Sequence, residues 1–174
     1  TGSLPVGEGA HGYKAVTFHG VGSDFPIFDD IHEFVVDRGL AAGAGDQVGT
    51  VLYNRGVYAA MLAAEAARTA QEIHGVADIT GAMMRDGMEA LTLDNDRLAE
   101  LGLGGFGPEI AVSCENHGGP GLGAIAQWDA INARWIQISD FGPANRSVVD
   151  PLIEADAMAF AAESNITPRD CAAE

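Results

Sequence analysis

The segment from Thr50 to His74 constrains the fold of this chain more than any other feature of its sequence. It is rich in alanine, contains no proline and is followed by Gly75. Val57, Met61 and Ala64 recur at the i, i+4 and i+7 spacing of one helical face. A glycine directly after such a segment is the common end of a helix. The pattern therefore predicts one long helix, with enough small side chains to pack closely against a sheet or another helix.

Helix and strand patterns alternate through the rest of the chain. Helices are expected where apolar residues recur every three or four positions after a capping residue, and strands where apolar and polar residues alternate. These patterns predict strands over 13–19, 110–114, 122–129 and 134–140, and helices over 26–38, 78–91, 93–101 and 150–164. The last two strands form a hairpin with Trp128 and Trp135 on either side of its turn. Helices mixed with few strands are typical of an α/β domain.

Several details of the shorter helices follow from capping and periodicity. Capping acidic residues are expected at Asp24, Asp78 and Asp94, and Asp150-Pro151 is expected to begin the last helix. The predicted buried positions are Ile27, Ile31, Phe34 and Val35 in the helix over 26–38, and Ile153, Ala157, Phe160 and Ala161 in the last one.

Composition indicates a compact domain with an acidic surface. The 174 residues suffice for a buried core, and 47% of them are hydrophobic while 20% are charged. A formal net charge of −16 opposes nucleic acid and anionic membrane surfaces as partners. No apolar run approaches the length of a membrane span, and no signal peptide is visible, although the chain begins at Thr1 without a methionine.

The cysteines are Cys114 and Cys171. A pair is the minimum for one disulfide, and two thiols alone cannot form a structural zinc site. The residues by themselves leave a disulfide and two unrelated free thiols equally open.

Few motifs indicate catalysis or cofactor binding. The loop His117-Gly118-Gly119-Pro120-Gly121 has the HGGxG pattern of an α/β-hydrolase oxyanion hole, but no serine in the chain lies in the G-x-S-x-G motif which that chemistry needs. The five histidines lack metal-binding spacing, and the acidic segment at Asp94 lacks the glycine and distal glutamate of a calcium loop. No metal, cofactor or catalytic residue is therefore predicted, and the chain is expected not to be an enzyme.

Several segments together resemble a family of transport proteins. These are the long helix with the residues before it, the run Ala111 to Glu115 with His117, Gln127-Trp128-Asp129, and the tail Ile166 to Cys171. They are similar to the extracytoplasmic solute-binding proteins of the branched-chain amino acid ABC uptake family, the Leu/Ile/Val-binding-like or type I periplasmic binding proteins. The resemblance covers the chain from about Gly12 to Cys171. Members are more than twice as long as this chain, so the resemblance is to their C-terminal half.

The resemblance implies a fold, a function and a set of partners. The implied fold is α/β: the C-terminal half of the two-lobed, Rossmann-like fold of the periplasmic binding protein-like I class. Residues 1–174 would form a single partial domain. It would contain a hinge-crossing strand, lobe helices, a β-hairpin and a C-terminal helix. The implied function is non-catalytic, periplasmic capture of a branched-chain or related amino acid, or a similar carboxylate or amide, by hinge closure. The implied partners are this ligand, an ABC permease and the missing N-terminal half, which carries most of the family's clamp for the ligand's amino and carboxylate groups. A homodimer remains open.

The resemblance also implies roles for individual residues. It places Tyr53, Asn54 and Arg55, at the start of the long helix, against the ligand, with Tyr53 as an aromatic wall and Asn54 or Arg55 reaching a polar group. From the sequence alone, an ordinary helix start with Tyr53 packed and Arg55 solvated is the alternative. The oxidising compartment favours a disulfide between Cys114 and Cys171. A sensor ectodomain on the same fold, and a hydrolase built on the loop at His117, are the alternative functions.

Overall fold

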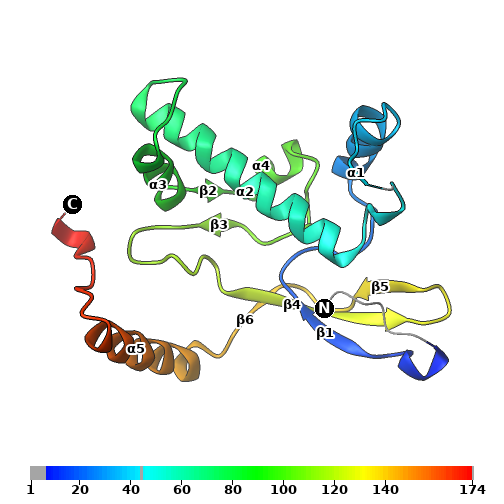
Figure 1. Ribbon diagram of the computed structural model, residues 1–174. Helices are drawn as coiled ribbons and strands as arrows, with labels where there is room; N and C mark the ends of the chain where they lie inside the picture. Colours follow the sequence, from blue (N-terminus) through cyan, green and yellow to red (C-terminus); the bar gives the residue numbers. More distant parts are fainter. Residues whose placement is uncertain (1–6, 44, 174) are drawn as a thin grey trace.

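The computed structural model describes residues 7–43 and 45–173, which form two layers that differ in secondary structure. The upper layer in Figure 1, which we call the helical body, contains four helices and a two-stranded sheet; the lower layer, the sheet body, contains the other strands and the last helix. The helical body comprises α1 (Pro26–Ile31), α2 (Val51–His74), α3 (Gly81–Glu89), β2 (Thr92–Leu93), α4 (Asn95–Glu100) and β3 (Ile110–Ala111). The sheet body comprises β1 (Lys14–Thr17), β4 (Leu122–Asp129), β5 (Arg134–Gln137), β6 (Gly142–Pro143) and α5 (Arg146–Glu163). Short turns of 3-10 helix cover Glu8–Ala10, Gly45–Gln47 and Cys171–Ala173.

The long helix is confirmed with the predicted ends. Thr50 is its N-cap residue, and Gly75 follows it in the left-handed conformation at φ 65°, which a residue without Cβ adopts most readily. Its buried face is rotated from the predicted one, because Ala64 is exposed while Glu65, Ala66 and Ala70 are buried with Met61.

The hydrophobic core lies in the helical body. It is formed by buried residues of α1, α2, the segment from 91 to 98, the connector after α4, and β3. These residues are Phe28, Met61, Leu91, Leu93, Leu98, Leu103, Phe106 and Ile110. Asp94 caps α4 as predicted, since its carboxylate accepts a hydrogen bond from the Arg97 amide at 2.8 Å. This cap directs Leu98 into the core.

The helix predicted over 26–38 is wrong in its cap and its length. Its N-cap residue is Phe25 rather than Asp24, and the regular helix ends at Ile31 before a π-helical turn over His32–Val36. The wider turn changes the periodicity, so Phe34 and Val35 are exposed and Phe28 takes the buried position instead. Ile27 and Ile31 pack against the core as predicted.

Two further boundaries differ from the prediction. Helix α3 starts after Thr80, whose hydroxyl accepts a hydrogen bond from the Met83 amide, instead of at Asp78. The strand predicted over 110–114 is limited to Ile110–Ala111, because it pairs with only the short β2 in the described part of the chain. Capping and pairing partners decide such boundaries, and periodicity reports neither.

Helices α2 and α3 pack closely against each other at Gly87. A Cβ at Gly87 would lie 2.2 Å from the Ala66 carbonyl oxygen and 2.7 Å from the Ala70 Cβ. Only hydrogen fits there, so the alanines of α2 and this glycine allow the two backbones to touch.

We therefore expect Gly87→Ala to destabilise the chain, although alanine has the higher helix propensity. The propensity gain is about 1 kcal/mol, and a forced displacement of packed backbone costs about 1–3 kcal/mol or more. Gly81→Ala in the same helix is the control, since a Cβ there meets nothing within 4 Å. Chemical denaturation of both variants measures the difference; equal or higher stability of Gly87→Ala would contradict the close crossing.

The sheet body is entirely antiparallel. Strand β4 is its centre and pairs with β1, β5 and β6, and the predicted hairpin is confirmed as β4 and β5, with Trp128 opposite Trp135. Along β4, Ala124, Ala126 and Trp128 are buried at every second position. This alternation is that of a sheet with one covered face.

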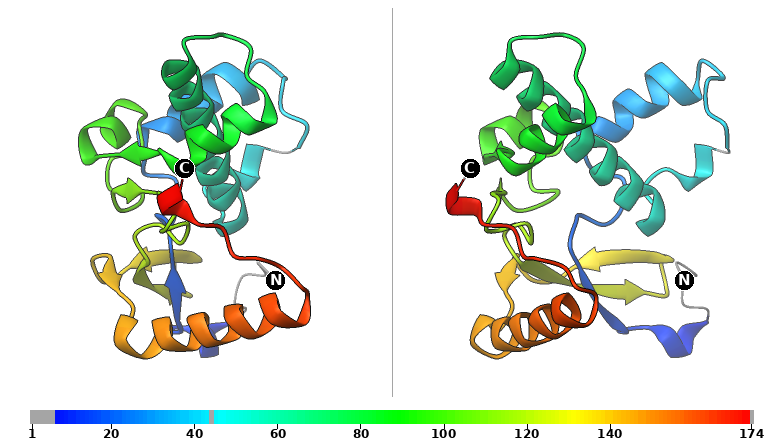
Figure 2. Two further views of the ribbon diagram at one scale, coloured as in Figure 1. Left: turned by 90° about the vertical axis from the view of Figure 1, so that its left-hand side faces the viewer. Right: turned by 60° about the vertical axis from the view of Figure 1, so that its left-hand side comes forward.

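The last helix differs from the prediction in its start and in its surroundings. It begins at Arg146, so Pro151 lies inside it, and the Arg146 guanidinium pairs with Asp150 one turn later. The predicted stripe is not buried in the described structure: Ile153 is 59% exposed, Phe160 is 63% exposed and only Ala161 is half-buried. Figure 2 shows α5 running along the outer side of the sheet body, away from the helical body. Its apolar face therefore lacks the cover that its sequence predicts.

The C-terminal tail returns from the sheet body to the helical body. In Figures 1 and 2 the chain leaves α5 and rises to the region of β3 and α3. Cys171 is joined there to Cys114 in a disulfide, the pairing that the resemblance implied, with the Cα atoms 5.7 Å apart. The guanidinium of Arg169 pairs with Glu89 at the end of α3. The tail therefore links the two bodies covalently.

Candidate ligand-binding site at the start of helix α2

The start of α2 is fixed to the segment that follows β1. Asn54 is fully buried, and its Nδ2 donates to the Gly20 carbonyl at 3.1 Å and to the Gly22 carbonyl at 2.8 Å. The Gly20 amide in turn donates to the Phe106 carbonyl of the core connector. A buried amide that satisfies two backbone carbonyls holds the segment in one place. Asn54 therefore supports the site from behind.

Tyr53 lies on the core side of the helix. Its ring is half-buried and packs against Phe28, with ring centroids 6.4 Å apart. Phe28 belongs to an aromatic cluster with Phe25 and Phe106. Tyr53 thus contacts the helical core, and no cavity that we describe below includes it in its wall.

Arg55 lies on a different face and lines a small cavity between the two bodies. The cavity has a volume of about 90 Å³. Its walls come from β1 and the residues after it, from the first turns of α2 and from the hairpin: Ala15, Val16, Thr17, Phe18, His19, Val21, Val51, Arg55, Ala126 and Trp135. Residues of both bodies therefore meet here, at the point where β1 passes from one body to the other.

His19 forms the back of this cavity as a neutral ring. It is 4% exposed and stacks on Phe106, with centroids 5.7 Å apart. Burial lowers the pKa of His19, since desolvation disfavours the imidazolium. Its Nδ1 lies 2.9 Å from the Gly20 carbonyl, and because a carbonyl only accepts, Nδ1 carries the hydrogen. The cavity wall at His19 thus adds no positive charge at neutral pH.

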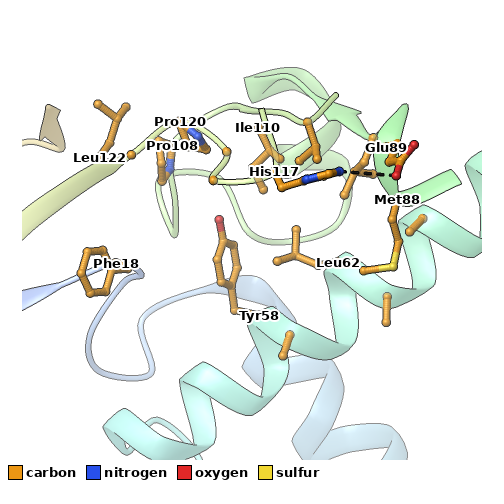
Figure 3. Close-up of a pocket in the computed structure, with 18 of the residues that line it drawn as sticks. Phe18, Tyr58, Leu62, Met88, Glu89, Pro108, Ile110, His117, Pro120 and Leu122 are labelled. Atoms are coloured by element: carbon orange, nitrogen blue, oxygen red, sulfur yellow. Dashed lines mark hydrogen bonds and ion pairs between the residues drawn. The ribbon is translucent and has the colours of Figure 1, made fainter. Parts of the chain in front are cut away.

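A much larger cavity lies further along the same face of α2, and Phe18 lines both cavities. It has a volume of about 770 Å³, and Figure 3 shows its apolar wall, which includes Phe18, Tyr58, Leu62 and Met88. Burial raises the pKa of the Tyr58 phenol, so this side chain is neutral. Such a wall suits apolar side chains better than a polar metabolite.

The loop at His117 closes one end of this large cavity. His117 Nε2 lies 3.4 Å from a Glu89 carboxylate oxygen, the contact drawn as a dashed line in Figure 3. The Arg169 guanidinium, and to a lesser degree His117, hold the pKa of Glu89 below its usual range. The described residues that line the cavity include neither serine nor cysteine. In the described residues no group of histidine, cysteine or acidic side chains is arranged to hold a metal ion.

The structure thus separates the residues that the sequence grouped. Tyr53, Asn54 and Arg55 are consecutive, but they contact the core, the backbone behind the site and the small cavity, respectively. Phe18 and Trp135 in the cavity wall were not identified as site residues. Two features of the sequence could have indicated them: Phe18 is an aromatic residue at the end of a predicted strand, and Trp135 lies beside the predicted hairpin turn. The binding role of the three residues stays a prediction.

The chain is similar to two solved structures from ABC transport systems. It matches a structure described as an ABC transporter permease from the Pseudomonas fluorescens group with 38% identity and a TM-score of 0.85, over 97% of this chain and 40% of that one. It also matches a branched-chain amino acid ABC transporter from Thermus thermophilus with bound valine, with 21% identity and a TM-score of 0.61, over 82% of this chain and 37% of that one. Neither a family model nor a curated protein matches the sequence.

These likenesses support part of what the sequence predicted. Both neighbours come from ABC transport systems, and the second one shares the fold. The chain spans about 40% of the length of the neighbour with the higher identity. Because that neighbour is described as a permease, a solute-binding role is not established by it. In the described part of the chain, no helix has the length and apolar character needed to cross a bilayer.

Proposed function

We propose that this chain is the C-terminal part of an extracytoplasmic solute-binding component of an ABC uptake system. It captures a small amino acid, or a related carboxylate or amide, without chemical change and delivers it to a membrane permease. The observation that carries this proposal is the cavity at the start of α2, because residues of both bodies line it. A ligand that contacts two bodies at once favours the arrangement in which they are closed upon it.

The small size of that cavity fits a partial site. A site for a complete small molecule occupies about 300–1,000 Å³, so a volume of about 90 Å³ takes one end of a ligand. We infer that the rest of the binding site comes from the preceding part of a longer polypeptide. The neighbours are much longer than the part of them that this chain matches, which supports the inference.

The same inference explains the uncovered apolar surfaces. The large cavity presents the small, exposed side chains of Ala59 and Ala63 on α2, a surface suited to close packing of a sheet. On the sheet body, Leu152, Ile153 and Phe160 of α5 are each more than half exposed. Exposed apolar surface of this extent usually marks an interface. We propose that the remainder of the polypeptide covers both surfaces.

If so, the chain of 174 residues should self-associate when it is produced alone. Burial of the exposed apolar surfaces between copies lowers the free energy, as their burial against the missing part would. Sedimentation velocity over a wide concentration range measures this. A folded monomer at every concentration would contradict the proposal that the chain is a partial domain. The preceding part of the polypeptide, added as a separate chain, should bind and suppress the self-association.

The transport function is tested on the full-length gene product. Calorimetry with amino acids and small carboxylates should find a ligand that binds one molecule per chain and is recovered unchanged. A turnover product in an esterase or aminopeptidase assay would instead favour the hydrolase. A signalling domain in the full-length product would favour the sensor ectodomain, which uses the same binding site.

A further inference from the structure

Arg55 stands out among the arginines because its guanidinium has no hydrogen bond, ion pair or ring contact with another described residue. In the described part of the chain Arg68, Arg85, Arg97, Arg134, Arg146 and Arg169 each pair with a carboxylate, and Arg38 contacts the Glu33 carbonyl and the Phe34 ring. Arg55 makes no such contact among the described residues, although the chain contains 25 acidic side chains. Its guanidinium therefore keeps its donors for another group.

The surroundings of Arg55 suit the anionic end of a small molecule. Phe18 and Trp135 provide aromatic walls, and the described residues that line the cavity contain no acidic side chain. A guanidinium binds a carboxylate through two parallel hydrogen bonds and an attraction between opposite charges. An amide is neutral and has only one acceptor oxygen, so it binds a guanidinium less strongly. Because the ring of His19 is neutral, Arg55 is the cation among the described residues that line this cavity.

Within this cavity, the lack of an acidic side chain in the described lining also limits what can lie next to that carboxylate. In an α-amino acid, the ammonium group is attached to the carbon that bears the carboxylate, so it would enter the same small space. It would meet Arg55 and aromatic or aliphatic walls, with no carboxylate of the described lining to pair with it. A carboxylate on an uncharged carbon, such as a side-chain carboxylate or that of a simple organic acid, has no such cost.

We propose that Arg55 binds a ligand carboxylate that has no adjacent ammonium group, so that the transported solute is an organic acid or an acidic amino acid. This inference rests on the proposed function and names its substrate class. It differs from the branched-chain amino acid that the sequence favoured, since an aliphatic side chain would leave the guanidinium unpaired in the closed site. The net charge of −16 repels anions at a distance, so a local cation is needed to hold one.

Matched carboxylates and amides test the proposal on the full-length gene product. The probes are butanoate and butanamide, benzoate and benzamide, glutamate and glutamine, and valine, each measured by calorimetry. We expect at least one carboxylate to bind tenfold or more tightly than its amide. In Arg55→Gln this preference should fall to within about threefold, and Arg55→Lys should keep part of it because it retains the charge but loses the paired donors.

Arg134→Gln is the control variant. Arg134 is an exposed arginine next to Trp135 and does not line the cavity, so its loss should leave the carboxylate preference unchanged. Because Arg55 is itself exposed, its replacement should not disturb the fold. Circular dichroism of each variant verifies this. Equal affinity for carboxylates and amides, or tightest binding of valine with no effect of Arg55→Gln, would overturn the inference and leave the transport function standing. A full-length protein that binds none of the amino acids and carboxylates would instead count against the proposed function itself.

Discussion

Replacing Glu65 with glutamine is expected to lower the free energy of unfolding by about 2–3 kcal/mol, because it breaks a buried network of ion pairs. The Glu65 side chain is 6% exposed, and its carboxylate accepts from Arg97 at 2.7 and 2.9 Å and from Arg68 at 3.0 Å. These bonds fasten α4 to α2 beneath the core. Loss of one partner of a fully buried pair costs about 3–5 kcal/mol, and we expect less here because both arginines remain partly exposed to water.

Glu100→Gln is the matched control for this variant. Glu100 also pairs with Arg97, at 2.9 Å, but its side chain is 67% exposed. An exposed pair of this kind contributes about 0–1 kcal/mol. Equilibrium denaturation in urea compares the two variants, and a loss in Glu65→Gln no larger than that in Glu100→Gln would show that burial does not strengthen the network.

The same carboxylate makes stability depend on pH in the acid range. Hydrogen bonds from Arg97, and then those from Arg68, lower the pKa of Glu65 in the folded chain. The unfolded chain therefore takes up this proton first as the pH falls, at about 4.3. The contribution of Glu65 is present above that pH and is lost as the pH falls through the folded pKa. Stability measured from pH 7 downward should decline less steeply in Glu65→Gln than in the unmodified chain.

Removal of the disulfide by Cys171→Ser should lower the free energy of unfolding by more than Glu65→Gln does. The bond closes a loop of 57 residues, which on the chain-entropy model contributes about 4 kcal/mol. In the described part of the chain, the pair between Arg169 and Glu89 also holds the tail. We therefore expect its release, and with it the loss of the covalent link between α5 and the helical body.

Denaturation with and without reductant measures this effect, and limited proteolysis between 164 and 170 shows whether the tail is released. The double variant Cys114→Ser/Cys171→Ser is the control, since reductant should leave its stability unchanged. Intact mass without reductant establishes the bond directly. Free thiols in protein from an oxidising compartment, or identical stability of the oxidised and reduced chains, would contradict the expectation.

Features that depend on neighbouring residues could be predicted from the sequence. The ends of α2, the Asp94 cap and the hairpin with facing tryptophans all depend on residues within a few positions of one another, and all were predicted. The π-helical turn after Ile31 was not predicted, since the chain there adopts a wider turn that no local residue requires. The disulfide followed from the family resemblance, whereas the positions of the two cysteines alone left it open.

Local pattern by itself determined where helices and strands form and which face of each is apolar. Only the tertiary structure decided whether that face is covered: the stripe on α5 has the periodicity of a buried helix, yet Ile153 and Phe160 are exposed. The same holds for the start of α2. Successive residues of a helix point about 100° apart, so Tyr53, Asn54 and Arg55 cannot share one wall. Which of them reaches the cavity depends on what packs against each face, and contacts between residues more than thirty positions apart, such as Asn54 with Gly20, decide that.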